Sequence, residues 1–124
     1  MQMTINHLDC FSGPGGFCTG FKASGIKTIC AIEYIDSCVE TYSYNHPEVK
    51  VLNQDIRSVD SDLIKSTING KEIDILTSGM PCETFSTAGS TSRSFYDKRQ
   101  ELYLEAIRIA EVVNAKIILF ENVV

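Results

Sequence analysis

The chain has 124 residues, which suits one small domain, and 44% of them are hydrophobic against 22% charged. This balance is typical of a chain that buries a core rather than one that stays disordered. No apolar run approaches the roughly 20 residues that span a bilayer, and the first ten residues lack the pattern of a signal peptide. We therefore expect a cytoplasmic protein that makes no use of a membrane. The net charge of −5 argues against a chain that grips nucleic acid by itself, because phosphate neutralisation needs a basic surface.

The five cysteines predict neither a disulfide framework nor a metal site. Their number is odd, no pair has the C-x-x-C spacing of a zinc site, and the histidines His7 and His46 lie far apart in sequence. Four cysteines have apolar neighbours in expected strands or helices and are predicted to be buried, inert thiols: Cys10, Cys18, Cys30 and Cys38.

The first half of the chain alternates apolar runs with helix-like stretches. Strands are predicted at 5–11, 27–33 and 49–52, and the second is rich in β-branched residues. A helix should follow the glycine-rich turn at 12–16 and end near Gly25. The next helix, capped by Asp36, should carry Val39 and Tyr42 on one face and end before Pro47.

The second half continues this alternation. A short helix is predicted at 63–68, and a fourth strand at 72–77 should open into a polar loop from Ser78 to about Tyr96. Apolar residues at helical spacing predict a long helix over 97–113, and a fifth strand should follow at 116–120. The pattern predicts an α/β fold with a mostly parallel sheet, in which ligands bind beyond the carboxyl ends of the strands.

Three features at those strand ends predict a pocket for a nucleoside cofactor. The turn at 11–16 (FSGPGG) lets the backbone approach a ligand closely, although it is not G-x-G-x-x-G and Pro14 removes one amide. Glu33 ends the second strand, where a carboxylate can accept hydrogen bonds from both ribose hydroxyls. Asp55 follows the third strand and either accepts from an adenine amino group or caps the turn into Ile56. These positions do not separate NAD from S-adenosylmethionine.

A cysteine in the loop after the fourth strand is a candidate nucleophile. Cys82 follows Pro81 in a polar segment shaped by Gly79, at the ligand end of the predicted sheet. A Pro-Cys pair alone favours the interpretation as a chance loop cysteine.

Three segments together resemble motifs I, IV and VI of the DNA cytosine-5 methyltransferases. They are 8–17 (LDCFSGPGGF), 81–86 (PCETFS) and 121–123 (ENV), and they occur in the family's order. Residues 97–102 resemble motif V, so the likeness covers essentially the whole chain. Met80, Glu83 and Thr84 depart from the residues that the family commonly has, without removing a group that the chemistry needs. The family's later motifs, target-recognition domain and last helix have no counterpart in this sequence.

The resemblance implies a Rossmann-like fold of the S-adenosylmethionine-dependent methyltransferases, with about five strands and incomplete at the C-terminus. Residues 1–124 would form the N-terminal part of the catalytic domain. The cofactor would be S-adenosylmethionine, with S-adenosylhomocysteine as product, and no metal. The residues implied to bind the cofactor are Phe11, Ser12, Gly13, Gly15, Gly16, Glu33, Tyr34, Asp55, Ile56 and Pro81.

The resemblance also implies the reaction. The Cys82 thiolate would add to carbon 6 of cytosine, and Glu121 would contact the ring nitrogen and amine while carbon 5 takes the methyl group. Double-stranded DNA would be contacted through Ser86 and Arg93. The polar, small residues of the loop 87–96 suit a lid over the flipped base, and they are equally consistent with a merely disordered loop.

The apolar run at 117–120 (IILF) suggests that the chain works with another part. Such a run is typical of a strand covered on both faces, yet nothing follows to cover it, so we expect an exposed apolar edge. That edge could take a second polypeptide or a missing C-terminal half, or could self-associate. We expect negligible methyl transfer and weak cofactor binding from the chain alone.

The expected setting is a bacterial restriction-modification protein, cytoplasmic or associated with the nucleoid. Two alternatives stay open, an RNA cytosine-5 methyltransferase and a non-catalytic subunit that binds cofactor. The missing G-x-G-x-x-G and the Pro81-Cys82 pair disfavour a dehydrogenase.

Overall fold

The computed structural model describes the backbone of residues 3–80 and 92–122, and the side chains of residues 3–80 and 100–122. Within these ranges, strands and helical segments alternate along the chain. The first half contains β1 (Asn6–Cys10), α1 (Gly16–Ala23), β2 (Lys27–Ile32), α2 (Asp36–Asn45) and β3 (Lys50–Leu52). The second half contains the short 3-10 helix η1 (Ile56–Ser58), then α3 (Ser61–Ile68), β4 (Ile75–Gly79), α4 (Ser92–Val113) and β5 (Ile117–Glu121).

The described strands form one parallel sheet in the order β3-β2-β1-β4-β5. The predicted α/β fold with a parallel sheet is therefore confirmed. Because all strands point the same way, the segments that follow them meet at one edge of the sheet. The strand order reverses between β1 and β4, and this switch point is where parallel α/β sheets bind ligands.

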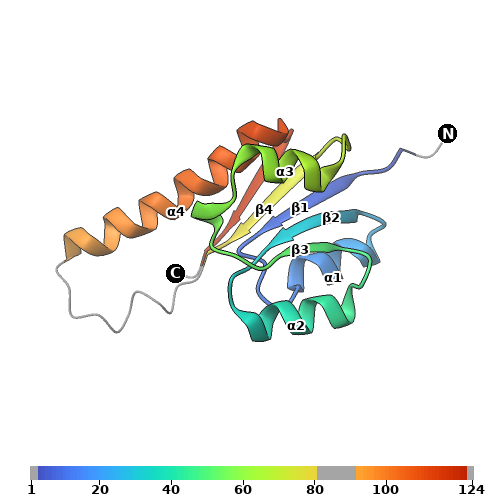
Figure 1. Ribbon diagram of the computed structural model, residues 1–124, viewed down its shortest axis with the longest axis horizontal. Coiled ribbons are helices and arrows are strands. Elements are labelled where there is room, and N and C mark those ends of the chain that lie inside the picture. Colours follow the sequence, from blue (N-terminus) through green and yellow to red (C-terminus); the bar gives the residue numbers. More distant parts are fainter. Residues whose placement is uncertain (1–2, 81–91, 123–124) are drawn as a thin grey trace.

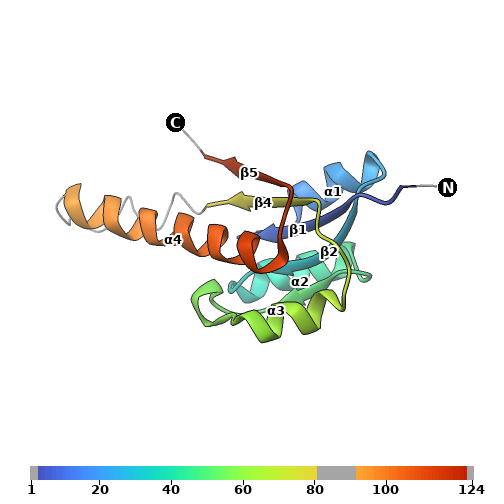
Figure 2. The same ribbon diagram turned by 90° about the horizontal axis from the view of Figure 1, so that it is seen from above.

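Helices cover both faces of the sheet, α1 and α2 on one side and α3 and α4 on the other (Figure 1, Figure 2). The larger apolar cluster includes Leu8, Leu76 and Ile109, and lies on the side of α3 and α4. A smaller cluster on the other side includes Cys18 and Tyr42. The central strands β1, β2 and β4 are thus mostly buried between two helical layers, as is typical of such folds.

The cysteine predictions hold for three of the four positions. Cys10, Cys18 and Cys30 are buried free thiols. Burial raises the pKa of Cys10, and it raises the pKa of Cys30 to about 12, so both are poor nucleophiles. Cys38 is only half-buried, contrary to the prediction, because it lies in the first turn of α2 at the open end of the sheet.

The predicted cap of α2 is wrong. The helix begins at Asp36 itself, after an extended Ile35 that makes no side-chain cap. The Asp36 carboxylate instead accepts a hydrogen bond from Asn53 Nδ2 at 3.0 Å. A side-chain cap does occur at α3, where Asp60 accepts from the backbone amide of Leu63 at 2.8 Å.

Several boundaries in the second half also differ from the prediction, and the largest differences are at the starts of α4 and β4. Helix α4 begins at Ser92, so residues 92–96, expected in a loop, are helical and the helix projects past the sheet edge (Figure 1). Strand β4 begins at Ile75, three residues later than predicted, because Asp74 instead connects the starts of β1 and β5 through hydrogen bonds. Its carboxylate accepts from the Asn6 amide at 2.8 Å, and its carbonyl accepts from the Ile117 amide at 2.9 Å.

Strand β5 lies at the edge of the described sheet, with all five residues exposed. Its four apolar residues are each 37% to 57% accessible to solvent: Ile117, Ile118, Leu119 and Phe120. The predicted exposed apolar edge is confirmed for this part of the chain. Unpaired edges of this kind favour association with another strand or chain.

Arg108 joins α4 to η1, and its removal should weaken the fold. Its guanidinium donates to the carbonyls of Val59 at 2.8 Å and Ile56 at 2.9 Å. We expect Arg108→Met to lower the free energy of unfolding by about 1.5–3 kcal/mol in urea denaturation, the range for hydrogen bonds to charged groups. Lys65→Met, on the exposed face of α3, is the control and should change it by no more than about 0.5 kcal/mol. Equal effects would show that Arg108 contributes no more than a surface residue.

Candidate active site

The turn that follows β1 has an unusual backbone. Phe11, Gly13 and Gly15 have positive φ angles of 51°, 56° and 108°. For a bulky residue such as Phe11 this conformation costs about 1–2 kcal/mol, and strain of this kind concentrates at functional sites. The turn is held by hydrogen bonds from the Ser12 amide to the Ile32 carbonyl at 3.2 Å and from the Gly15 amide to the Ser12 carbonyl at 3.3 Å.

The glycines of the turn have different surroundings. A methyl group added to Gly13 or Gly16 would meet no atom within 4 Å. One added to Gly15 would lie 3.1 Å from Tyr42 Cδ2 and 3.2 Å from His46 Cδ2. The turn is thus open to a ligand at Gly13 and Gly16 and closed against α2 at Gly15.

Glu33, directly after β2, is buried and reaches back to the turn. Its Oε2 accepts from the Gly13 amide at 2.8 Å, and its Oε1 accepts from the Ile35 amide at 3.1 Å. A carboxylate has about four lone-pair positions, so hydroxyl donors can still be accepted. The structure therefore brings together two of the predicted site residues, and the exposed Tyr34 (53% accessible) follows immediately.

Asp55 lies after β3 and caps η1. Its carboxylate accepts from the Arg57 amide at 2.9 Å and pairs with the Arg57 guanidinium at 2.7 Å. The hydrogen bond from the Arg57 side chain lowers the pKa of the Asp55 carboxyl. Of the two expectations for this residue, the cap is observed, while contact with adenine stays a prediction. Ile56 is buried beneath it.

Glu121, the last residue of β5, lies over Gly79 at the end of β4. A methyl group at Gly79 would lie 3.8 Å from Glu121 Oε2, 3.8 Å from the Phe11 carbonyl oxygen and 3.7 Å from Phe17 Cε2. The turn after β1, helix α1 and the end of β5 therefore converge on Gly79 at the end of β4. The candidate catalytic carboxylate and the candidate cofactor turn therefore both lie near Gly79.

Several predicted residues cannot be located. Pro81, Cys82 and Ser86 lie outside the described residues, as does the 87–91 part of the expected lid. Arg93 belongs to the first turn of α4, and its side chain also lies outside the description. Among the residues described, no group of three or more His, Cys, Asp or Glu side chains could hold a metal ion.

A buried polar network beneath the turn was not predicted. Asp9, fully buried on β1, accepts from Thr77 Oγ1 at 2.8 Å and from the Tyr42 hydroxyl at 3.3 Å. His7 lies between Thr28 Oγ1 (2.8 Å from Nδ1) and Thr77 Oγ1 (2.7 Å from Nε2). The sequence did contain a signal for this network. His7 and Asp9 are polar residues that alternate with apolar ones in a strand that is expected to be buried.

The hydrogen bonds of this network have one consistent direction. Because the single proton of Thr77 goes to Asp9, Thr77 accepts from His7 Nε2, and Thr28 donates to Nδ1. Burial lowers the pKa of His7 to about 4, in agreement with this neutral ring. Burial also raises the pKa of Asp9 to about 7, against the effect of the two hydrogen bonds that it accepts.

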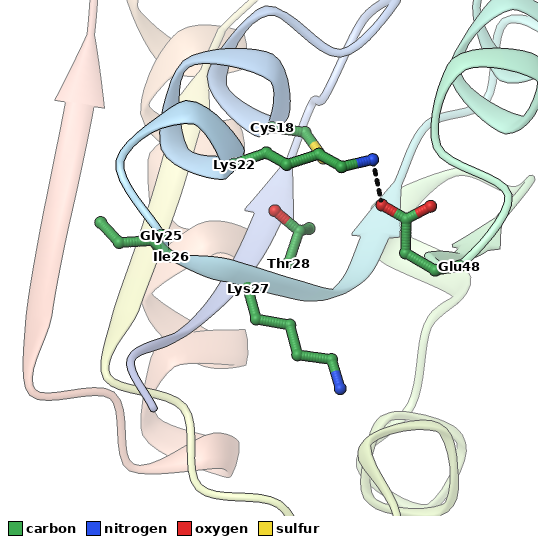
Figure 3. A pocket seen from close by; sticks show the side chains of 7 residues that line it. All are labelled: Cys18, Lys22, Gly25, Ile26, Lys27, Thr28 and Glu48. Carbon is green, nitrogen blue, oxygen red and sulfur yellow. Dashed lines mark hydrogen bonds and ion pairs between the residues drawn. The ribbon is translucent and has the colours of Figure 1, made fainter. Parts of the chain in front are cut away.

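A separate hollow of about 240 Å³ lies at the opposite, amino edge of the sheet (Figure 3). Cys18 and Thr28 line it, and Lys22 Nζ donates to Glu48 Oε1 there at 2.8 Å. Because it lies at the end of α1 and the start of β2, it is not part of the candidate cofactor site.

The comparisons with known proteins agree with this arrangement. The model of the family described as C-5 cytosine-specific DNA methylase matches residues 5–124. The chain is 34% identical over 122 residues to the Type II methyltransferase M1.HphI of Haemophilus parahaemolyticus, covering 98% of this chain and 33% of that protein. It is 36% identical to M.AquIA of Picosynechococcus, covering 94% of this chain and 47% of that protein.

A solved structure from E. coli, a DNA modification methyltransferase encoded within a prophage, superimposes with a TM-score of 0.79 at 27% identity. The match covers 97% of this chain and 32% of that one. The chain thus spans from about a third to about half of the length of these proteins.

The chain therefore has the Rossmann-like fold of the S-adenosylmethionine-dependent methyltransferases. More narrowly, the chain belongs to the C-5 cytosine-specific DNA methylase family, whose model matches nearly all of it. None of its described helices is both long and apolar enough to cross a membrane.

Two glycine variants should show that Gly15 is needed for the stability of the turn, whereas Gly16 lies on its open side. Gly15→Ala places a side chain on a backbone with positive φ, and its methyl group crowds Tyr42 and His46. We therefore expect it to lower the free energy of unfolding by about 1–3 kcal/mol. Gly16→Ala meets no neighbour and starts α1, so stability should stay the same or rise slightly. Urea denaturation measures both. Equal losses of stability would contradict the assigned difference.

The Asp9–His7 pair should give opposite pH effects on stability. The pKa of Asp9 rises on folding from 3.8 to about 7, so its contribution is full below pH 3.8 and is lost as the pH rises towards 7. The pKa of His7 falls from 6.5 to about 4, so its contribution is full above pH 6.5 and is lost as the pH falls towards 4. Between pH 4 and 6.5 the two slopes oppose each other.

We therefore expect that the pH dependence caused by His7 becomes visible in the free energy of unfolding of Asp9→Asn. The free energy of unfolding of this variant, relative to wild type, should rise with pH between 4 and 6.5, by up to about 1.4 kcal/mol per pH unit. Glu40→Gln, an exposed carboxylate on α2, is the control. Parallel pH profiles for wild type and Asp9→Asn would show that Asp9 titrates at its ordinary pKa.

Proposed function

We propose that this chain carries the cofactor pocket and the nucleophile of an enzyme that methylates carbon 5 of cytosine in DNA. The proposal assigns S-adenosylmethionine as cofactor, Cys82 as nucleophile and Glu121 as the group that stabilises the activated base. The observation that carries it is the convergence of the glycine turn, Gly79 and Glu121 at the switch point of a parallel sheet. Family membership over residues 5–124 supports the same assignment.

The residues at the carboxyl edge fit an adenosine-containing cofactor. The turn is open at Gly13 and Gly16, and the carboxylates of Glu33 and Asp55 follow neighbouring strands. Glu33 would accept from ribose hydroxyls and Asp55 from an adenine amine, with Tyr34 and Ile56 flanking the base. Phe11, Ser12, Gly15 and Pro81 complete the proposed binding set. When bound, S-adenosylmethionine supplies an electrophilic methyl group.

Carbon 5 of cytosine is a poor nucleophile, and the protein residues answer this by covalent catalysis. The Cys82 thiolate forms a bond to carbon 6, and the electron pair displaced from the 5,6 double bond makes carbon 5 nucleophilic. Glu121 binds the ring nitrogen and exocyclic amine and stabilises this charge. After carbon 5 is methylated, a base removes its proton, the double bond re-forms and the sulfur–carbon bond to Cys82 breaks.

The DNA-gripping surface is proposed to lie mainly on another part of the enzyme. The net charge of −5 is unfavourable for holding phosphates, and the target base must leave the duplex at a cost of a few kcal/mol. Ser86 and Arg93 are the proposed DNA contacts on this chain.

Activity is proposed to require a completing C-terminal part, as a second polypeptide or a further segment. Strand β5 exposes four large apolar side chains, and the chain matches a third to a half of its relatives' length. A partner that covers β5 would bury this apolar edge, which is favourable by roughly 25 cal/mol per Å².

The test is to trap the covalent intermediate. The purified chain is incubated with double-stranded DNA containing 5-fluorocytosine and with S-adenosylmethionine, with and without a C-terminal half taken from a relative such as M.AquIA. Fluorine at carbon 5 blocks the final elimination, so a competent Cys82 should give a protein–DNA adduct that mass spectrometry maps to that residue. We expect the adduct only when the C-terminal half is present.

Cys82→Ala should abolish the adduct, while Cys38→Ala, at a half-buried cysteine, should keep it. An adduct with the chain alone would refute the need for completion. If both halves are folded and no adduct forms, the same assay with RNA distinguishes an RNA cytosine-5 methyltransferase from a non-catalytic subunit that only binds cofactor.

A further inference from the structure

Gly15 is the point at which the glycine turn contacts α2. Its backbone has φ 108° and ψ 31°, and its carbonyl accepts from both the amide and the hydroxyl of Thr19 at 2.9 Å. On the opposite side, the Cδ2 atoms of Tyr42 and His46 lie only 3.1–3.2 Å from where a side chain would begin. These two side chains therefore form the surface on which Gly15 rests.

The hydrogen bonds of His46 point to the same role. Thr19 has one hydroxyl proton and donates it to Gly15, so its oxygen accepts from His46 Nε2 at 3.0 Å. In a neutral ring this leaves Nδ1 as an acceptor. Nδ1 is buried, and no described residue donates to it. An apolar side chain would avoid that unfavourable burial, so packing alone does not explain an imidazole here.

Tyr42 anchors this arrangement to the sheet. Its side chain is fully buried, its hydroxyl donates to Asp9 Oδ2 at 3.3 Å, and its ring packs edge-on against His46 with centroids 5.3 Å apart. The His46 amide donates to the Tyr42 carbonyl at 2.8 Å where α2 ends. A continuous set of contacts thus runs from β1 through Tyr42, His46 and Thr19 to Gly15.

We propose that Tyr42 and His46 are positioning residues for the cofactor, which hold Gly15 in its left-handed conformation and so set the shape of the turn at 12–16. The inference rests on the proposed function, in which this turn binds S-adenosylmethionine. Neither side chain reaches the open side of the turn, because no atom lies within 4 Å of a methyl group at Gly13 or Gly16. Both residues therefore act through Gly15.

Four variants test this inference. His46→Leu removes the Nε2 donor and keeps an apolar side chain of useful size, whereas His46→Gln offers a donor in nearly the same place. Tyr42→Phe removes only the hydroxyl that contacts Asp9. Tyr44→Phe, on the same helix with 87% of its side chain exposed, is the matched control.

Two measurements are made on the whole chain. Affinity for S-adenosylhomocysteine, measured by NMR titration, should fall about tenfold in His46→Leu and about threefold to tenfold in Tyr42→Phe, the effect of one lost hydrogen bond. His46→Gln should regain most of this loss, and Tyr44→Phe should match wild type. Without ligand, hydrogen exchange at the amides of Ser12, Gly13, Gly15 and Gly16 should be faster in His46→Leu and Tyr42→Phe and slow again in His46→Gln.

The outcomes distinguish a positioning role of His46 and Tyr42 from a role in packing alone. They also distinguish failure of this inference from failure of the proposed function. The free energy of unfolding of His46→Leu should equal or exceed that of wild type, because the bare Nδ1 is gone. Unchanged exchange at the turn in both His46→Leu and Tyr42→Phe would overturn the inference, as would a loss of stability in His46→Leu that His46→Gln does not reverse. If wild type binds no S-adenosylhomocysteine even when the C-terminal half is present, the proposed function fails, and the exchange data still decide whether His46 and Tyr42 set the turn.

Discussion

Strand β1 is buried on both faces, and the hydrogen bonds of Asp9 and His7 make this possible. A buried polar group without a partner is costly, so these two side chains require donors and acceptors at fixed places. Thr28 on β2, Thr77 on β4 and Tyr42 on α2 supply them at 2.7–3.3 Å. The network therefore ties the three central strands and one helix together directly beneath the point where β1 ends. The glycine turn starts one residue after that strand, so its position depends on the same contacts.

The turn itself combines strain with support from two sides. Phe11, Gly13 and Gly15 all have positive φ angles, which the two glycines adopt readily, whereas the unfavourable conformation of Phe11 persists because the neighbouring elements hold it. Glu33 accepts from the Gly13 amide on one side, and α2 packs against Gly15 on the other. What remains open is the surface at Gly13 and Gly16, next to Gly79 and Glu121. The proposed cofactor turn and the candidate catalytic carboxylate thus share one corner of the sheet, as the proposed methyl transfer to a base would require.

The exposed strand β5 and the acidic charge have a common interpretation. A chain of net charge −5 has little electrostatic attraction for DNA, and an edge with four accessible apolar side chains favours further association. The family relatives are two to three times longer than the matched region. Both features fit the proposal that another part of the enzyme supplies the DNA-binding surface and covers this edge.

The sequence by itself determined the alternation of strands and helices, the parallel sheet and the set of motifs at its carboxyl edge. These follow from local chemistry, since β-branched runs, helical spacing and glycine turns act over a few neighbouring residues. It did not reveal that α2 lacks an aspartate cap or that α4 begins at Ser92, because polar residues are compatible with both a loop and a helix start. The partners of His7 and Asp9 lie 21 to 70 residues away in the chain, and His46 meets Thr19 across 27. Only the packing of distant segments could decide those contacts, because no local pattern encodes which buried polar groups will satisfy one another.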